Sequence, residues 1–169
     1  MTVTIINNEL ITSGLLSARK KDKLGIIGAL SLCEADPKKT QGEIVIPLHN
    51  NMNNLPGRVL EILNVIDMEL EMKHRPFLIH CEHGRDRSPT IAALFLYYSG
   101  KFHSFSAALR FVQSRNSKLK PKKEFVKFIE EEVVPLIQKR TNGRIEPRSK
   151  APSKTKRKEA LKIEQFAVP

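Results

Sequence analysis

Short apolar runs separated by turn-forming residues mark the first half of the chain. The runs over residues 25–33, 42–48 and 75–81 have the length and bounding residues that are typical of buried strands. Residues 9–16 contain a further short apolar run, which is broken by a glycine. Residues 55–72 carry apolar side chains at steps of three and four, and this spacing predicts an amphipathic helix.

Three more helices are predicted in the second half. Residues 88–100 form an almost wholly apolar run, which we expect to be a buried helix with Ser88 as its N-cap and Gly100 at its C-terminus. Two further helices are predicted from Ser104 and over residues 121–139. The order of strands and helices predicts an α/β fold with a central, mostly parallel sheet flanked by helices.

The positive charge of the chain is concentrated near its C-terminus. The net charge is +11, and residues 139–169 contribute ten Lys and Arg against three acidic residues. Because this stretch has few large apolar side chains, we predict a disordered basic tail after a folded domain over residues 1–138. The tail could bind RNA or another polyanion, or serve as a nuclear address, and a simple solvated tail is the alternative.

Composition excludes two broad classes of protein. With two cysteines, Cys33 and Cys81, the chain cannot be a disulfide-framed secreted domain. No apolar run approaches the ~18–20 residues of a membrane-spanning helix, and the first residues do not resemble a secretory signal. We therefore expect a cytoplasmic or nuclear monomer that does not bind membranes.

The sequence HCEHGRDRS, at residues 80–88, carries the chemistry. It joins a predicted strand to a helix N-terminus, where backbone N–H groups and the helix dipole favour an anion. Arg87 can bind two oxygens of one phosphate, and the thiolate of Cys81 can attack phosphorus to form a phosphocysteine. Ser88 could donate a hydrogen bond to the sulfur when it leaves.

This sequence resembles the signature of the cysteine-dependent protein tyrosine phosphatases, and the spacing of the flanking elements resembles their compact dual-specificity branch. The resemblance extends over about residues 5–138. It implies that Cys81 is the nucleophile, that Ser88 assists the thiolate, and that His80 orients the loop from behind. It also implies phosphomonoester hydrolysis without a cofactor or metal. The implied phosphate-binding residues are Glu82, His83, Gly84, Arg85, Asp86 and Arg87.

One position departs from the pattern of the family. The family places a general-acid Asp about four residues after the Ile of an Ile-Pro strand, and counting from Ile46 leads to Asn50, which has no proton to give. General acid catalysis is typically worth about 10²–10⁴-fold in rate. His49 or Asp86 could supply the proton instead, or the substrate could have a leaving group that needs little protonation.

These observations predict an intracellular hydrolase, a protein phosphatase that acts on phosphotyrosine, with phosphoserine and phosphothreonine as further targets. Its partner would be a phosphorylated protein. One alternative is an RNA 5′-triphosphatase, or a polyphosphate or inositol phosphate phosphatase. A second alternative is a catalytically weak module that binds phosphorylated groups without turning them over.

Overall fold

The structure is a computed structural model that describes residues 3–15, 25–34, 42–49, 54–72 and 76–142. The chain divides into two compact units, Met1–Gln138 and Lys139–Pro169. The disordered tail predicted from the sequence falls almost entirely on residues 143–169, which lie outside the described part. The sheet, most of the helices and the site belong to the first unit.

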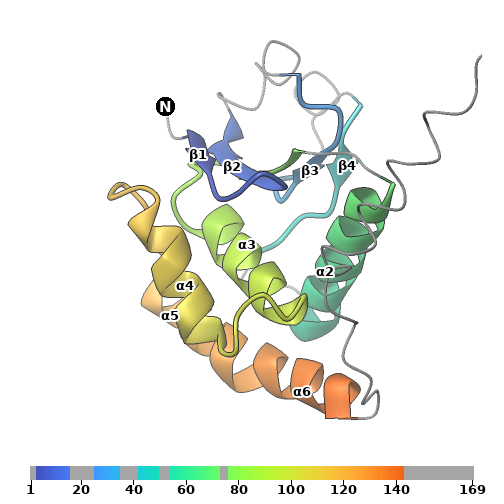
Figure 1. Cartoon of the computed structure of the whole chain (residues 1–169), viewed down its shortest axis with the longest axis vertical. Helices are drawn as coiled ribbons and strands as arrows, with labels where there is room; N and C mark the ends of the chain where they lie inside the picture. Colours follow the sequence, from blue (N-terminus) through green and yellow to red (C-terminus); the bar gives the residue numbers. More distant parts are fainter. Residues whose placement is uncertain (1–2, 16–24, 35–41, 50–53, 73–75, 143–169) are drawn as a thin grey trace, which may run out of the picture. The chain divides into compact units, whose positions relative to one another are not determined.

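Five strands form the central sheet (Figure 1). Its order is β1-β2-β5-β3-β4, and only the β1–β2 pair is antiparallel. The predicted α/β fold with a mostly parallel sheet is therefore confirmed. The strands are β1 (Val3–Ile5), β2 (Leu10–Gly14), β3 (Ala29–Ser31), β4 (Ile44–Val45) and β5 (Phe77–Cys81).

The pattern of apolar residues did not predict β1 and β2 as strands. All residues of β2 are buried, yet its second half is Thr12, Ser13 and Gly14, which has no apolar side chain. Apolar side chains are the signal by which a buried strand is predicted from sequence. This signal is missing where the neighbours of the strand in the sheet, rather than its own side chains, exclude water.

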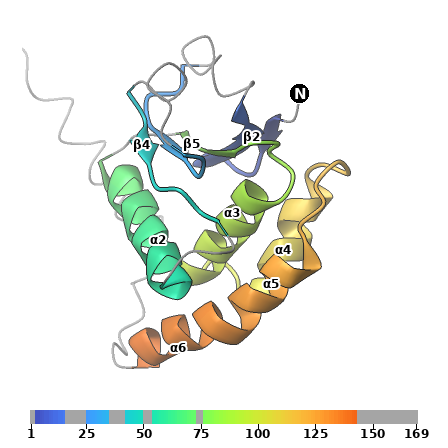
Figure 2. The same cartoon turned by 180° about the vertical axis from the view of Figure 1, so that it is seen from behind.

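The helices of the described residues lie on one side of the sheet in both views (Figures 1 and 2). A π-helical segment, Ile129–Val133, joins the last two of them into one continuous rod. This rod starts later than the predicted helix over residues 121–139 and runs past Gln138. The helices are α2 (Leu55–Glu71), α3 (Arg87–Tyr98), α4 (Phe105–Ser114), α5 (Lys123–Phe128) and α6 (Val134–Asn142).

Alternate strand residues face two different sets of apolar side chains, because successive side chains of a strand point to opposite faces. In β5, Phe77, Ile79 and Cys81 belong to the large core that includes the buried faces of the helices. Leu78 belongs to a smaller cluster with Ile11, Ile26 and Ala29. Cys81 and its neighbour His80 therefore point in opposite directions at the end of β5.

The helix ends agree with the sequence at two places and differ at a third. Ser104 caps α4 by accepting a hydrogen bond from the N–H of Ala107 at 3.2 Å, and Gly100, with φ of 73°, follows the last residues of α3. Ser88 is not the N-cap of α3, because that helix begins at Arg87. The carbonyl of Asp86 already accepts the N–H of Thr90 at 3.2 Å, so the helix starts two residues earlier than predicted.

Candidate active site

The loop over residues 82–86 connects the end of β5 to the start of α3 and lies directly on the end of β2. Gly84 has a φ of +68°, and a Cβ atom at this position would lie 2.2 Å from the nitrogen of Gly14. A Cβ atom on Gly14 would in turn lie 2.9 Å from the carbonyl carbon of His83. Two glycines that are distant in the sequence therefore allow the backbones of the loop and the strand to touch.

The thiol of Cys81 is buried beneath this loop, with only 2% of the residue exposed. Its sulfur accepts a hydrogen bond from the N–H of Gly84 at 3.3 Å and lies 3.4 Å from the hydroxyl of Ser88. The same hydroxyl lies 3.4 Å from the carbonyl oxygen of Ser13. Since Ser88 has one O–H, it donates either to the sulfur or to this carbonyl. The N–H of Gly84 and the O–H of Ser88 can both stabilise a thiolate at Cys81, because hydrogen bonds to charged groups are stronger than those to neutral ones.

The guanidinium of Arg87 is fixed by two backbone carbonyls. Its Nη1 donates to the oxygen of Leu32 at 3.2 Å and to that of Leu48 at 2.9 Å, which uses both hydrogens of that nitrogen. The edge formed by Nε and Nη2 donates no hydrogen bond to any of the described residues, and Nη2 lies 3.9 Å from a carboxylate oxygen of Glu82. This edge has the geometry that binds two phosphate oxygens at once.

A buried hydrogen-bonded pair lies at the end of β5. Nε2 of His80 is 2.7 Å from Oε2 of Glu43, and the two side chains are 0% and 2% exposed. Among the described residues, Nδ1 of His80 has no hydrogen-bond partner. The position of this imidazole therefore depends on one carboxylate, which belongs to the residue directly before β4.

The 115–122 loop, which connects α4 to α5, is attached to the 82–86 loop by two hydrogen bonds. The N–H of Lys120 donates to the carbonyl oxygen of Arg85, and the N–H of Lys122 donates to Oδ1 of Asp86, each at 2.8 Å. The carboxylate of Asp86 therefore holds a neighbouring segment, a role that the sequence did not suggest.

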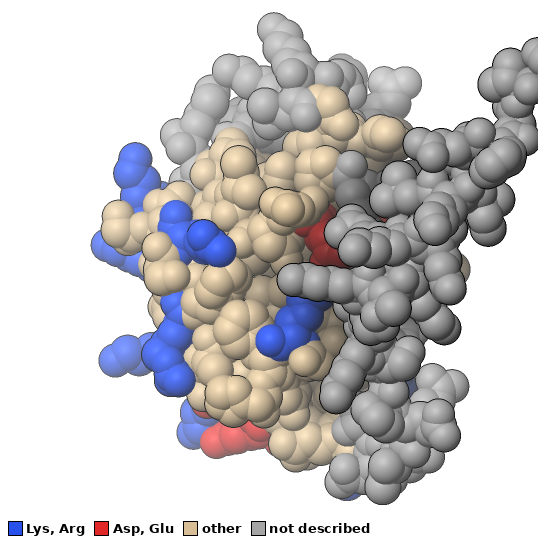
Figure 3. Space-filling model, viewed as in Figure 1, with Lys and Arg blue, Asp and Glu red and all other residues tan. Residues whose placement is uncertain are grey.

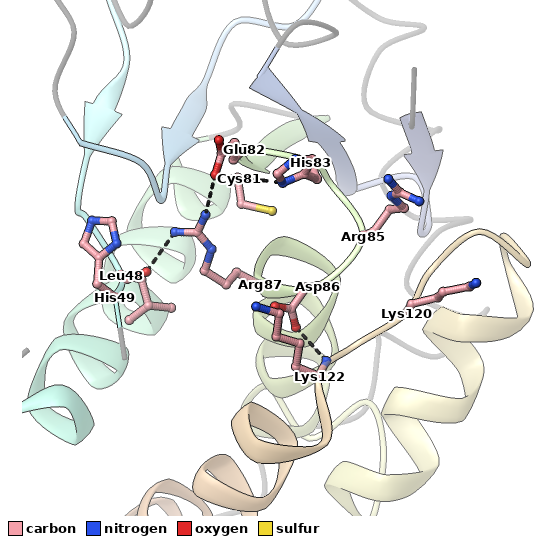
Figure 4. A pocket seen from close by; sticks show the side chains of 10 residues that line it. All are labelled: Leu48, His49, Cys81, Glu82, His83, Arg85, Asp86, Arg87, Lys120 and Lys122. Atoms are coloured by element: carbon pink, nitrogen blue, oxygen red, sulfur yellow. Dashed lines mark hydrogen bonds and ion pairs between the residues drawn. The ribbon is translucent and has the colours of Figure 1, made fainter. Parts of the chain in front are cut away.

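These residues surround a cavity of about 670 Å³, which is shown in Figure 4. Cys81 and Arg87 lie together in it, as do all the residues of the 82–86 loop except Gly84, which is buried against β2. His49 also lines it, and its Nε2 is 2.9 Å from Oε1 of Glu34. Asn50, the position of the expected general acid, lies outside the described residues. The lining residues are Leu48, His49, Cys81, Glu82, His83, Arg85, Asp86, Arg87, Lys120 and Lys122.

Sequence reasoning missed the groups that come from distant segments. Glu43 could have been noticed as a lone acid at the start of an apolar strand, where an unpaired carboxylate is costly. Lys120 and Lys122 gave no signal, since a lysine-rich loop is usually a solvated surface. The carbonyls of Leu32 and Leu48 could not be found at all, because every residue carries such a group.

The second cysteine, Cys33, lies just after β3 and is half-buried. Burial raises the pKa of its thiol above the ordinary value, and the positive charge of Arg87 partly opposes this rise. At neutral pH Cys33 is therefore a thiol rather than a thiolate, and the thiolate is the form of cysteine that acts as a nucleophile.

Among the described residues, no group of three or more His, Cys, Asp and Glu side chains could hold a metal ion. None of the helices in the described part is long and apolar enough to cross a membrane.

Solved structures of phosphatases share this fold. The PTP-2 phosphatase of Cydia pomonella matches with a TM-score of 0.66 at 18% identity, covering 76% of this chain and 88% of the other. Human DUSP28 matches with a TM-score of 0.65 at 16% identity, covering 79% and 94%. A human tyrosine phosphatase-like serine/threonine/tyrosine-interacting protein matches with a TM-score of 0.62 at 19% identity, covering 76% and 93%.

Sequence comparison gives the family. No curated protein sequence matches the chain significantly. The family model described as the catalytic domain of dual-specificity phosphatases matches residues 11–132, which include Gly14, where β2 meets the 82–86 loop, and every residue that lines the cavity. Since this match covers well over half of the sequence, the chain belongs to the dual-specificity phosphatase family.

Proposed function

We propose that this protein hydrolyses phosphotyrosine in proteins through a phosphocysteine on Cys81, with phosphoserine and phosphothreonine as further targets. One observation carries the proposal. The sulfur of Cys81, with its two hydrogen-bond donors, and the edge of Arg87 formed by Nε and Nη2 line the same cavity. This arrangement places a nucleophile and a phosphate clamp within reach of one phosphoryl group.

The reaction would take two steps. First, the thiolate of Cys81 attacks phosphorus, so that an S–P bond forms while the P–O bond to tyrosine breaks and the leaving oxygen takes up a proton. Arg87 and the N–H groups of the 82–86 loop stabilise the charge on the three other oxygens. Water then attacks phosphorus while it gives a proton to the group that protonated the leaving oxygen, and the S–P bond breaks to release phosphate and the thiolate. Ser88 moves its hydrogen bond from the carbonyl of Ser13 to the departing thiolate.

The proton for the leaving group has two candidate donors in the cavity. Asp86 accepts the N–H of Lys122 with one carboxylate oxygen, and at the cavity wall Nε2 of His49 lies 2.9 Å from a carboxylate oxygen of Glu34. We favour His49 as the acid, because it directly precedes position 50, where the family places its acid. A His49→Gln variant should lose more activity on substrates with poor leaving groups than on those with good ones, because only poor leaving groups need the proton.

The proposal is tested by measuring phosphate release from a phosphotyrosine peptide, a phosphoserine peptide and 5′-triphosphate RNA. The wild-type chain is compared with Cys81→Ser and with Cys33→Ser as the matched control. We expect release from the phosphotyrosine peptide that Cys81→Ser abolishes and Cys33→Ser retains. Activity that survives in Cys81→Ser would contradict the mechanism.

The sequence at position 50 favours a second candidate, hydrolysis of a 5′-triphosphate or another phosphoanhydride. Such a leaving group departs as a stable anion, so an Asn at this position would cost little. Faster release from 5′-triphosphate RNA than from the phosphotyrosine peptide would favour this candidate. Binding of phosphopeptide without any turnover by the wild-type chain would instead indicate a binding module.

A further inference from the structure

The outer side of β1 is an open edge of the sheet. β1 ends the strand order, and nothing in the described part of the chain pairs with its outer side. The N–H of Ile6 donates to the carbonyl of Leu10 at 2.9 Å. Because the hydrogen-bonding groups of an antiparallel strand alternate in direction, those of Thr4 also face β2. The N–H and C=O groups of Val3 and Ile5 therefore point away from the sheet.

β1 also carries two of the exposed large apolar side chains. Val3 is 42% exposed and Ile5 is 65% exposed. Both lie on the sheet face without described helices, because Ile5 is opposite Ile11 of the smaller apolar cluster. Thr4 points to the other face, where its Oγ1 accepts a hydrogen bond from Asn116 at 2.9 Å. The orientation of the strand is therefore fixed before any partner binds.

This edge lacks the residues that normally protect an edge strand. Sheets usually block such edges with charged side chains, especially lysine, or with proline. Residues 1–8, which include β1, have the sequence MTVTIINN, without a charge or a proline. In Figure 3 the Lys and Arg side chains gather along the side of the molecule where α4 lies in Figure 1, and none of them belongs to β1. The edge is therefore open to another strand.

We propose that the outer edge of β1 pairs with the same edge of a second copy of this chain, as antiparallel strands related by a two-fold axis. The symmetry sets the register. When Thr4 lies opposite Thr4 of the other copy, Val3 lies opposite Ile5 of the other copy, and their outward backbone groups form hydrogen bonds. Each such pair also brings two β-branched side chains together on one face. The two sheets then form one continuous sheet.

This dimer should be weak, and salt should strengthen it. The paired strand has three residues, and contacts that bury less than about 1,200 Å² belong to transient complexes. Each copy carries a net charge of +11, so the copies repel one another, and salt screens this repulsion. The sequence predicts a monomer, but its apolar pattern does not reveal β1 as a strand, so the edge is apparent only in the fold. The proposal is independent of the catalytic activity.

Sedimentation velocity of the full chain, between about 10 µM and 1 mM, tests the association. We expect the average mass to rise with protein concentration and with salt. Ile5→Lys should raise the dissociation constant about tenfold or more, because it places a charge within the pairing. Ile27→Lys is the matched control, since Ile27 is 71% exposed and lies outside β1. It adds the same charge and should leave the dissociation constant unchanged. Urea denaturation checks that both variants are folded.

Disulfide formation tests the register. Val3→Cys and Ile5→Cys are made separately in a chain that has serine at both natural cysteine positions, and are oxidised with copper phenanthroline. Directly opposed residues of a hydrogen-bonded pair have Cα atoms about 5.5 Å apart, which a disulfide spans. Two copies of Val3, or two of Ile5, are diagonal neighbours about 7–8 Å apart. A mixture of the two variants should therefore cross-link much faster than either variant alone.

Three outcomes would overturn the proposal. A chain that stays monomeric at the highest protein and salt concentrations would leave this edge to a strand of another protein. Equal weakening of the dimer by Ile5→Lys and Ile27→Lys would show that the association does not depend on β1. Cross-linking of either cysteine variant alone as fast as the mixture would show that the copies do not meet in this register.

Discussion

At the scale of single residues, the buried carboxylate of Glu43 is the group on which the position of His80 depends. We expect Glu43→Ala to lower the free energy of unfolding by about 1–3 kcal/mol, because the buried imidazole of His80 loses a hydrogen-bond partner. Glu43→Gln should cost less, since its amide can still bond to Nε2 of His80, which is 2.7 Å from the carboxylate. Urea denaturation measures both values. Equal losses in the two variants would show that the hydrogen bond to His80 is unimportant.

The two cysteines should differ in reactivity, and the difference has a definite pH dependence. Burial raises the pKa of Cys33, so its thiolate fraction stays small at neutral pH and grows only as the pH rises toward that pKa. We expect iodoacetamide to label Cys81 well before Cys33 at pH 7, and the labelling of Cys33 to increase with pH. Peptide mass spectrometry follows each site. Preferential labelling of Cys33 at pH 7 would contradict this assignment.

At the scale of elements, the contact between the 82–86 loop and β2 leaves no room for a side chain at Gly84. Gly84→Ala combines an unfavourable backbone conformation with an overlap, because its Cβ would lie 2.2 Å from a backbone nitrogen. We expect a loss of about 2–4 kcal/mol in the free energy of unfolding, together with loss of phosphatase activity.

Gly100 supplies the matched control for this prediction. Its φ of 73° is close to that of Gly84, but a Cβ atom there would meet nothing within 4 Å. Gly100→Ala should therefore cost only about 1 kcal/mol, the strain of the backbone alone. The two variants are compared by thermal and urea unfolding. A Gly84→Ala variant no less stable than Gly100→Ala would mean that the loop can move away from β2.

The same contact explains what the sequence could and could not predict. The strand, loop and helix that carry Cys81 and Arg87 are continuous in the chain, so their apolar pattern and their motif were sufficient to predict them. Nothing in Thr12, Ser13 and Gly14 identifies a central strand, because their burial depends on partners far away in the sequence. The Glu43–His80 pair is hidden for the same reason, since it joins residues 37 positions apart.

At the scale of the whole molecule, the domain should not need the C-terminal residues. The family model ends at residue 132, and the last helix in the described part of the chain ends at Asn142. A chain that stops after Asn142 should unfold at the same urea concentration as the full chain and should retain its kcat/KM on a singly phosphorylated peptide. Urea denaturation and the phosphate-release assay measure these properties. A marked loss of stability would show that residues 143–169 contribute to the fold.

The contact between Gly14 and the 82–86 loop also affects the stage of folding at which the anion site forms. None of the residues that line the cavity lies in β2, yet the loop takes its shape against the end of that strand. β2 pairs with β5 only after a long stretch of intervening chain has been brought together, and such distant pairings form late in folding. A molecule in which β5 and α3 had already assembled would therefore hold the complete motif and still lack a formed anion site. The protein would therefore become able to bind phosphate when β2 pairs with β5, and not when the residues of the motif are synthesised.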